Sequence, residues 1–141
     1  MSGSLGQSKP CGFNILTRIV YVHQTFSLVV HGSGLSSLLA KGSGFQALST
    51  GAGLVIAVAT AIAMFGVAKQ KSLPALAWLR VFLWAAVFRG ALSVLMLFGT
   101  SDIAIAGFVR AMILNEGILI PLAIYWSRAV HGRYLASLRA G

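Results

Sequence analysis

Acidic residues are nearly absent from this sequence: two Asp and Glu stand against eleven Lys and Arg in 141 residues, a formal net charge of +9. With so few carboxylates, the chain has no pair of acids of the kind that acid and base catalysis uses. Charged residues of both signs make up only 9% of the chain, compared with about 25% in a soluble domain. Hydrophobic residues make up 57%, so we expect a single domain that folds in a bilayer.

Cysteine is equally scarce. Because Cys11 is the only one, a disulfide within the chain is excluded, and a cysteine-rich zinc or iron–sulfur site has too few ligands. The sequence also has no arrangement of Ser, His and Asp suited to hydrolysis and no Gly-rich loop of phosphate-binding pattern. We therefore expect a protein that is not an enzyme and holds no metal.

Two histidines in the first apolar segment raise the question of a cofactor, because imidazole is the usual axial ligand of haem iron. His23 and His31 are eight residues apart, so on one helix their depths differ by about 12 Å and they cannot clamp one haem from opposite faces. Either histidine could still hold a single haem or magnesium pigment. We expect instead that both are polar residues of a marginal helix and that no cofactor binds.

The excess of positive charge does not predict a nucleic-acid-binding protein, because the chain has no long polar domain to carry that function. The basic residues flank apolar runs, where such residues set topology and contact anionic lipid head groups. Contact with lipid or with a partner protein is therefore expected for four flanking residues: Lys69, Lys71, Arg128 and Arg133.

The alternation of apolar and polar stretches predicts one all-α membrane domain over residues 13–134, between a flexible tail at 1–12 and a basic tail at 135–141. Within the domain we expect four helices at about 13–40, 45–68, 74–99 and 103–128. The second is the clearest because it carries no charge. It also has a stripe of small side chains at four-residue spacing, which lets another helix approach closely: Ser49, Gly53, Ala57 and Ala61.

The first segment is the least apolar, since four polar side chains interrupt it: Arg18, His23, Gln24 and His31. It could cross the bilayer, or it could lie in the interface as an amphipathic helix and leave three crossings. Four crossings would place nearly all basic residues on the side of the two termini. Because basic loops stay in the cytoplasm, we favour a four-helix transmembrane bundle with both termini cytoplasmic.

One charge lies near the middle of each of the last two predicted helices. Arg89 and Glu116 are equally far from the predicted turn at 100–102, roughly 20 Å by helix rise. In an antiparallel hairpin they would share one level, close to the midplane of a hydrocarbon core about 30 Å thick. The two residues would form either a structural interhelical pair or part of a pathway for protons or ions.

A third charge, Arg110, lies on a largely different face of the last helix and has no internal acid to balance it. By helix rise it is about 11 Å from the turn. We expect lipid phosphate or an acidic residue of a partner chain to neutralise it.

The second half of the chain carries short motifs between and after its helices: Phe65, Lys69, Lys71 and Pro74, then Ile120, Pro121 and Tyr125, and finally residues 127–130. With these residues the stretch from Leu54 to Tyr134 resembles small four-helix bacterial inner-membrane proteins, catalogued as a domain of unknown function. The resemblance implies a membrane bundle and no particular activity.

The functional expectation is a non-catalytic multi-pass subunit that packs against other membrane proteins or further copies of itself. The alternative is a small oligomeric transporter or channel with Arg89 and Glu116 on its pathway.

Overall fold

The computed structural model describes residues 8–41, 44–99 and 103–140, and these ranges contain helices but no strand. The helices are α1 (Phe13–Lys41), α2 (Gly44–Ala68), α3 (Leu73–Leu97), α4 (Ile103–Ser127) and α5 (Ala129–Arg139). They confirm the predicted all-α fold. The predicted turn at 100–102 lies outside the described residues.

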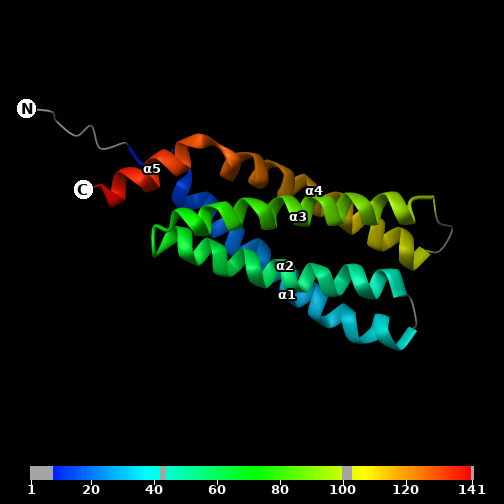
Figure 1. The fold of residues 1–141 in the computed structure, drawn as a ribbon. Helices are drawn as coiled ribbons and strands as arrows, with labels where there is room; N and C mark the ends of the chain where they lie inside the picture. The colour runs from blue at the N-terminus through cyan, green and yellow to red at the C-terminus, as the bar shows by residue number, and fades with distance from the viewer. Residues whose placement is uncertain (1–7, 42–43, 100–102, 141) are drawn as a thin grey trace, which may run out of the picture.

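The four long helices form a bundle in which each helix packs on the next one along the chain. α1 packs on α2, α2 on α3 and α3 on α4, while α5 touches α3. The start of α1 and helix α5 lie at the same end of the bundle as the α2–α3 turn (Figure 1). This follows from the short connections, because a helix that turns back after a few residues runs antiparallel to its neighbour.

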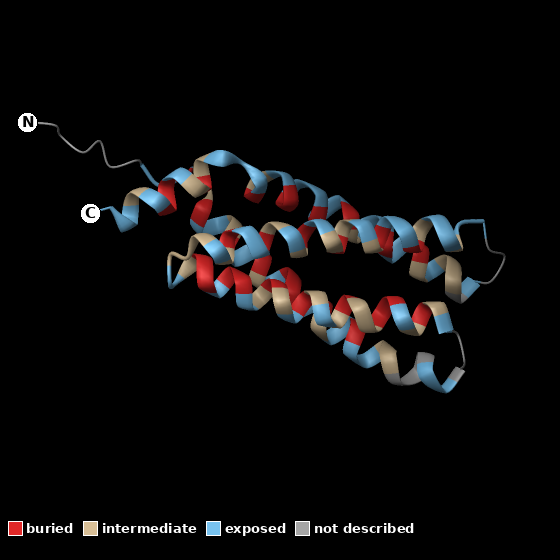
Figure 2. Cartoon of the chain, viewed as in Figure 1, coloured by how far each residue is buried: buried red, intermediate tan, exposed pale blue. Residues whose placement is uncertain are grey.

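Three helical stretches are long and apolar enough to cross a membrane: Gly44–Ala68, Leu73–Leu97 and Ile105–Ser127, with mean hydropathies of 2.2, 1.6 and 1.6. Their outer surfaces are apolar too, and side chains such as Val55, Phe88 and Leu114 are largely exposed. Figure 2 shows the buried residues on the inner sides of the helices and the exposed ones outside. Exposure of so large an apolar surface to water would be unfavourable, so the chain is built as a helical membrane protein.

Helix α3 supplies the centre of the apolar core. Leu76, Leu79 and Leu83 follow one another at three- and four-residue spacing, so they lie on one face of the helix, and all three are buried. They share one apolar cluster with Met64 of α2 and Leu119 of α4. The middle helix of the bundle thus holds its two neighbours together.

The turn between α2 and α3 reverses the chain within a few residues. Lys71 takes a left-handed conformation with φ 51°, and its side chain donates to the carbonyl oxygen of Ala68 at 2.5 Å. Ser72 then caps α3 by accepting a hydrogen bond from the backbone of Ala75 at 3.3 Å, with Pro74 in the first turn. This agrees with the preference of helix starts for serine caps and early prolines.

The structure corrects the predicted C-terminal boundary, because the residues taken as a basic tail continue a packed fifth helix. In α5, His131, Tyr134 and Leu135 are buried against the bundle, at helical spacing. Phe13 at the start of α1 contacts the ring of Trp126 at 5.2 Å and that of Tyr134 at 5.6 Å between centroids. The domain therefore extends to Arg139.

An arginine of α3 holds the junction between α4 and α5 through two hydrogen bonds. Arg80 of α3 donates from Nε to the carbonyl oxygen of Trp126 at 2.9 Å and from Nη2 to that of Arg128 at 3.1 Å. The carbonyl group of Trp126 lies in the last turn of α4, where helical partners are lacking. That of Arg128 also accepts hydrogen bonds from the backbone nitrogen of His131 at 3.3 Å and from Nδ1 of His131 at 3.2 Å. Burial and the nearby charges of Arg80 and Arg128 lower the pKa of His131, which keeps its imidazole neutral inside this corner.

The native cysteine allows a test of whether α1 crosses the membrane. Cys11 is exposed just before α1, and Gly44 begins α2 beyond the other end of α1. If α1 crosses, a membrane-impermeant maleimide should label Cys11 from one side of the membrane. It should label Gly44→Cys, in a chain that also carries Cys11→Ser, only from the other side. Labelling of both cysteines from the same side would leave α1 in the interface and only three crossings.

Candidate functional site

A buried polar cluster occupies the middle of the bundle, and each of the four long helices contributes to it. Its members are His23, Gln24, Ser27 and His31 of α1, Ser49 of α2, Arg89 and Ser93 of α3, and Asn115 and Glu116 of α4. The α1 residues recur at spacings of one, three and four, which puts them on one helix face. Of the four polar side chains that interrupt the apolar sequence of α1, all but the exposed Arg18 are thus turned inward.

Arg89 is held by a chain of serine hydrogen bonds. Its Nη1 donates to the carbonyl oxygen of Ser49 at 3.1 Å and to the hydroxyl of Ser49 at 3.2 Å. Ser93 donates its hydroxyl proton to the carbonyl oxygen of Arg89 at 2.9 Å. Because a hydroxyl has one proton to give, Ser49 is the donor in the 2.7 Å bond between the two serines. Two oxygen atoms of Ser49 in α2 therefore take the place of water as hydrogen-bond acceptors for Nη1 of Arg89.

The two histidines of α1 are fixed in different tautomers by their partners. The amide of Gln24 donates to Nδ1 of His23 at 3.1 Å, so Nε2 carries the proton and donates to Oδ1 of Asn115 at 2.7 Å. His31 donates from Nδ1 to the carbonyl oxygen of Ser27 at 2.7 Å. This leaves Nε2 of His31 as a buried acceptor without a partner in the described structure. The bond between His23 and Asn115 joins α1 directly to α4.

Two glycines make room for these side chains. A Cβ added at Gly53 would lie 2.7 Å from Nε2 of His31 and 3.0 Å from Cζ of Arg89, so the imidazole and the guanidinium group meet over the backbone of α2. A Cβ at Gly90 would lie 1.8 Å from Oε1 of Glu116, so this carboxyl group rests directly on the backbone of α3. Neither contact is possible with a larger residue, because real Cβ contacts do not come so close.

The predicted stripe of small residues on α2 faces these neighbours within the same chain. Ser49, Gly53 and Ala57 are buried, and Ala61 is half-buried. The stripe therefore serves the packing of α2 on α1 and α3, and in this structure it is not a free surface for another protein.

Arg89 and Glu116 lie at one level, since Glu116 rests on Gly90, the residue after Arg89. They are not in direct contact: both carboxylate oxygens of Glu116 and Nε of Arg89 are buried and have no hydrogen-bond partner in the described part of the chain. Arg89 lines a cavity of about 10 Å³ together with His23, His31 and Asn115, among others, and Glu116 is not part of its lining. This volume is about the space one water molecule needs, and the cavity wall is polar enough to hold one.

The arrangement places a fixed cation, Arg89, near two groups that can accept a proton: Nε2 of His31 and the carboxyl group of Glu116. The small cavity beside Arg89 and His31 has space for one water molecule. Burial favours the neutral form of Glu116, whereas the positive charge of Arg89 favours the ionised form. The balance between these two effects sets whether the carboxyl group holds a proton. Such a site can take up, hold and release a proton deep inside the bundle.

The other predicted contact residues lie outside this cluster. Arg110 is exposed on the outer side of α4, and Lys69, Arg128 and Arg133 are exposed at the end of the bundle that carries the termini. Lys71 is half-buried at the same end, where partial burial and the like charges of Lys9 and Lys69 lower its pKa. A group of three or more His, Cys, Asp and Glu side chains that could hold a metal is not found in the described ranges.

No family model, curated protein or solved structure matches this chain. The resemblance of its second half to small four-helix inner-membrane proteins therefore stays a prediction.

Sequence reasoning did not identify the hydrogen-bonding role of α1. It treated His23, Gln24 and His31 as residues that weaken the helix. The signal that would have identified them is their spacing together with that of the buried Val20 and Ser27, which places all five on one face of a helix.

Replacement of Gly90 tests the contact between α3 and Glu116. Gly90→Ala should lower the free energy of unfolding by about 1–3 kcal/mol, because the new Cβ overlaps the carboxyl group of Glu116, which must leave its buried position or push the helices apart. Thermal unfolding in mild detergent measures this, with Gly51→Ala, which meets nothing within 4 Å, as the matched control. In a Glu116→Ala chain the effect of Gly90→Ala should largely vanish. If Gly90→Ala lowers the free energy of unfolding of the Glu116→Ala chain by as much as that of the wild type, Glu116 is not the group that the new Cβ overlaps.

Proposed function

We propose that this chain is a non-catalytic multi-pass membrane subunit that packs against helices of another membrane protein through the outer side of α4. The observation that carries the proposal is Arg110. It is exposed on a membrane-spanning helix and has no hydrogen-bond or ion-pair partner in the described structure. A lone arginine on a lipid-facing surface is costly, so a partner helix that offers an acidic side chain would stabilise it.

The residues around Arg110 support a helix contact. We define the α4 outer face as Gly107, Arg110, Leu114, Gly117 and Pro121, which recur at three- and four-residue spacing and are all exposed. A Cβ at Gly107 or Gly117 would meet nothing within 4 Å, so the surface is open at both glycines. Small residues on a membrane helix let a second backbone come close, which is how such helices associate.

A different protein is a better partner for this face than a second copy of the chain. The acids of a second copy would be Asp102 and Glu116. Glu116 is buried against α3, and in the sequence Asp102 precedes the start of α4, eight positions before Arg110. The proposed partner therefore carries an Asp or Glu in a membrane-spanning helix, at the depth of Arg110.

The charge distribution supports an orientation for the subunit. Lys9, Lys69, Lys71 and the basic residues of α5 lie at the end of the bundle that carries both termini (Figure 1). Since basic segments stay in the cytoplasm, we propose a bacterial inner membrane with both termini inside.

A photo-crosslinking amino acid at Leu114 tests the docking face in cells. It should give an adduct with a membrane protein that the same amino acid at Val55 of α2, which is similarly exposed, does not give. Arg110→Glu should abolish the adduct and Arg110→Lys should preserve it, because only the first reverses the charge. Once mass spectrometry has identified the partner acid, exchange of the two charges should restore the adduct. Equal adducts from Leu114 and Val55, or no effect of Arg110→Glu, would contradict the proposal.

A second candidate function rests on Glu116. A buried carboxyl group with two unpartnered oxygens beside a cation is the kind of intramembrane site that proton pathways use. This favours a small oligomeric transporter or channel in which Glu116 takes up and releases a proton and Arg89 tunes its charge.

Proton flux into liposomes separates the two functions. In vesicles loaded with a pH-sensitive dye and given a potassium diffusion potential, the wild-type chain should acidify the lumen if the pathway exists. Glu116→Gln should abolish the flux, because an amide cannot carry the proton, and the exposed Arg133→Gln should leave it unchanged. Flux that is absent in the wild type, or equal in Glu116→Gln, would exclude this second function.

A further inference from the structure

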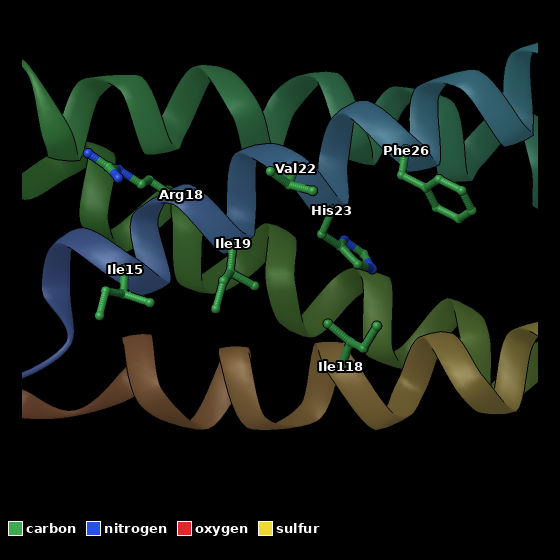
Figure 3. Close-up of a pocket in the computed structure, with 7 residues that line it drawn as sticks. All are labelled: Ile15, Arg18, Ile19, Val22, His23, Phe26 and Ile118. Atoms are coloured by element: carbon green, nitrogen blue, oxygen red, sulfur yellow. The ribbon is translucent and has the colours of Figure 1, made fainter.

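An apolar groove runs along the outside of the bundle between α1 and α4. Its volume is about 490 Å³, within the usual size of a ligand pocket. Ile15, Ile19, Val22 and Phe26 of α1 and Ile118 of α4 form its apolar lining, as Figure 3 shows, with His23 and Arg18 as the remaining members. The groove exists because α1 packs on α2 and α4 on α3, so that α1 and α4 have few close backbone contacts.

Arg18 also lines a second cavity, which is polar and basic. This cleft has a volume of about 360 Å³ and lies between the start of α1 and the α2–α3 turn. Lys69 and Lys71 face it from the turn, and Asn14, Thr17 and Tyr21 face it from α1. Its lining contains three cationic side chains and no acid. The cleft therefore offers an excess of positive charge together with hydrogen-bonding groups.

Like charges act on one another around this cleft, since the positive charges of Lys9 and Lys69 contribute to the lowered pKa of Lys71. The ammonium group of Lys9 lies 5.2 Å from the centre of the Phe13 ring, and that of Lys71 lies 5.7 Å from it. The side chain of Lys9 is bonded to Asn14, and that of Lys71 to a backbone carbonyl group. Arg18 and Lys69 have no hydrogen bond or ion pair within the described chain and are exposed. An anion bound here would relieve the repulsion between like charges.

We infer that the two cavities together bind one anionic phospholipid, with its phosphate at Arg18 and Lys69 in the basic cleft and an acyl chain in the groove between α1 and α4. The order of the two cavities matches that of such a lipid. The cleft lies at the end of the bundle where the basic helix flanks meet the membrane surface, and the groove continues from Arg18 along α1 toward the middle of the bilayer. Basic pockets between membrane helices are known to bind anionic head groups.

The cleft and the groove recognise different parts of the lipid. An arginine and a lysine beside each other recognise phosphate by charge-assisted hydrogen bonds, and the neighbouring hydroxyl and amide groups can donate or accept as well. The groove discriminates by shape, since isoleucine, valine and phenylalanine side chains offer contact area and no polar partner. The site rests on α1, the α2–α3 turn and Ile118 of α4. Ile118 is not part of the α4 outer face, so the inference holds whether or not that face binds a partner.

Native mass spectrometry of the full chain tests the inference. The protein is released from a mild detergent that contains equal amounts of phosphatidylglycerol and phosphatidylcholine. The wild type should retain one phosphatidylglycerol in preference to phosphatidylcholine. Arg18→Gln should weaken this retention about tenfold, as expected for the loss of one charge-assisted hydrogen bond. Arg18→Lys should keep most of it. Arg133→Gln removes the same charge from an exposed position on α5 and should have no effect.

A second pair of variants tests the groove. Val22 and Val55 are 69% and 68% exposed, but only Val22 lines the groove. Val22→Trp should fill the groove and lower the retention of phosphatidylglycerol, whereas Val55→Trp should not. Equal retention of the two lipids by the wild type would overturn the inference. Unchanged retention of phosphatidylglycerol in both Arg18→Gln and Val22→Trp would also overturn it. A loss of retention in Arg133→Gln as large as that in Arg18→Gln would do the same.

Discussion

The need to solvate Arg89 inside the bundle is the constraint on which the arrangement of the long helices depends. A buried guanidinium group needs acceptors, and Glu116, at the same level, does not contact it. The acceptors come instead from α2, through the backbone and hydroxyl oxygens of Ser49. This requires α2 and α3 to approach closely at this depth, and the absence of a side chain at Gly53 permits it. The position of one cation thus sets the contact between two helices.

The same requirement extends to α1 and α4. Once Arg89 and Glu116 occupy the centre, the helices that close the bundle cannot present only apolar surface there. Helix α1 therefore turns its histidines and Gln24 inward, where His23 bonds to Asn115 of α4. Its outward side chains, including Val22 and Phe26, are apolar and exposed. A helix with modest hydropathy can thus run beside spanning helices, because most of its inward polar groups form hydrogen bonds inside the protein.

The sequence was sufficient where the signal is local. The uncharged run of α2, the turn between Lys71 and Pro74 and the equal distances of Arg89 and Glu116 from the predicted turn can all be read without a structure. What could not be read depends on contacts between distant residues. α5 is anchored by Arg80 of α3, and the role of His23 depends on Asn115, 92 positions away. The function of Gly90 becomes visible only when a side chain of α4 is placed against it.

The scarcity of acids connects the interior of the molecule with its surface. Of the two carboxylates in the sequence, Glu116 is enclosed in the bundle, so it cannot neutralise the cations outside. Arg18 and Lys69 at one end and Arg110 on the outer side of α4 are exposed and form no ion pair within the described residues. Water and salt can screen the first two charges at the membrane surface, but the hydrocarbon layer offers neither to Arg110. An acidic side chain of a partner helix, as proposed for Arg110, would supply the counter-charge that the enclosed Glu116 does not supply.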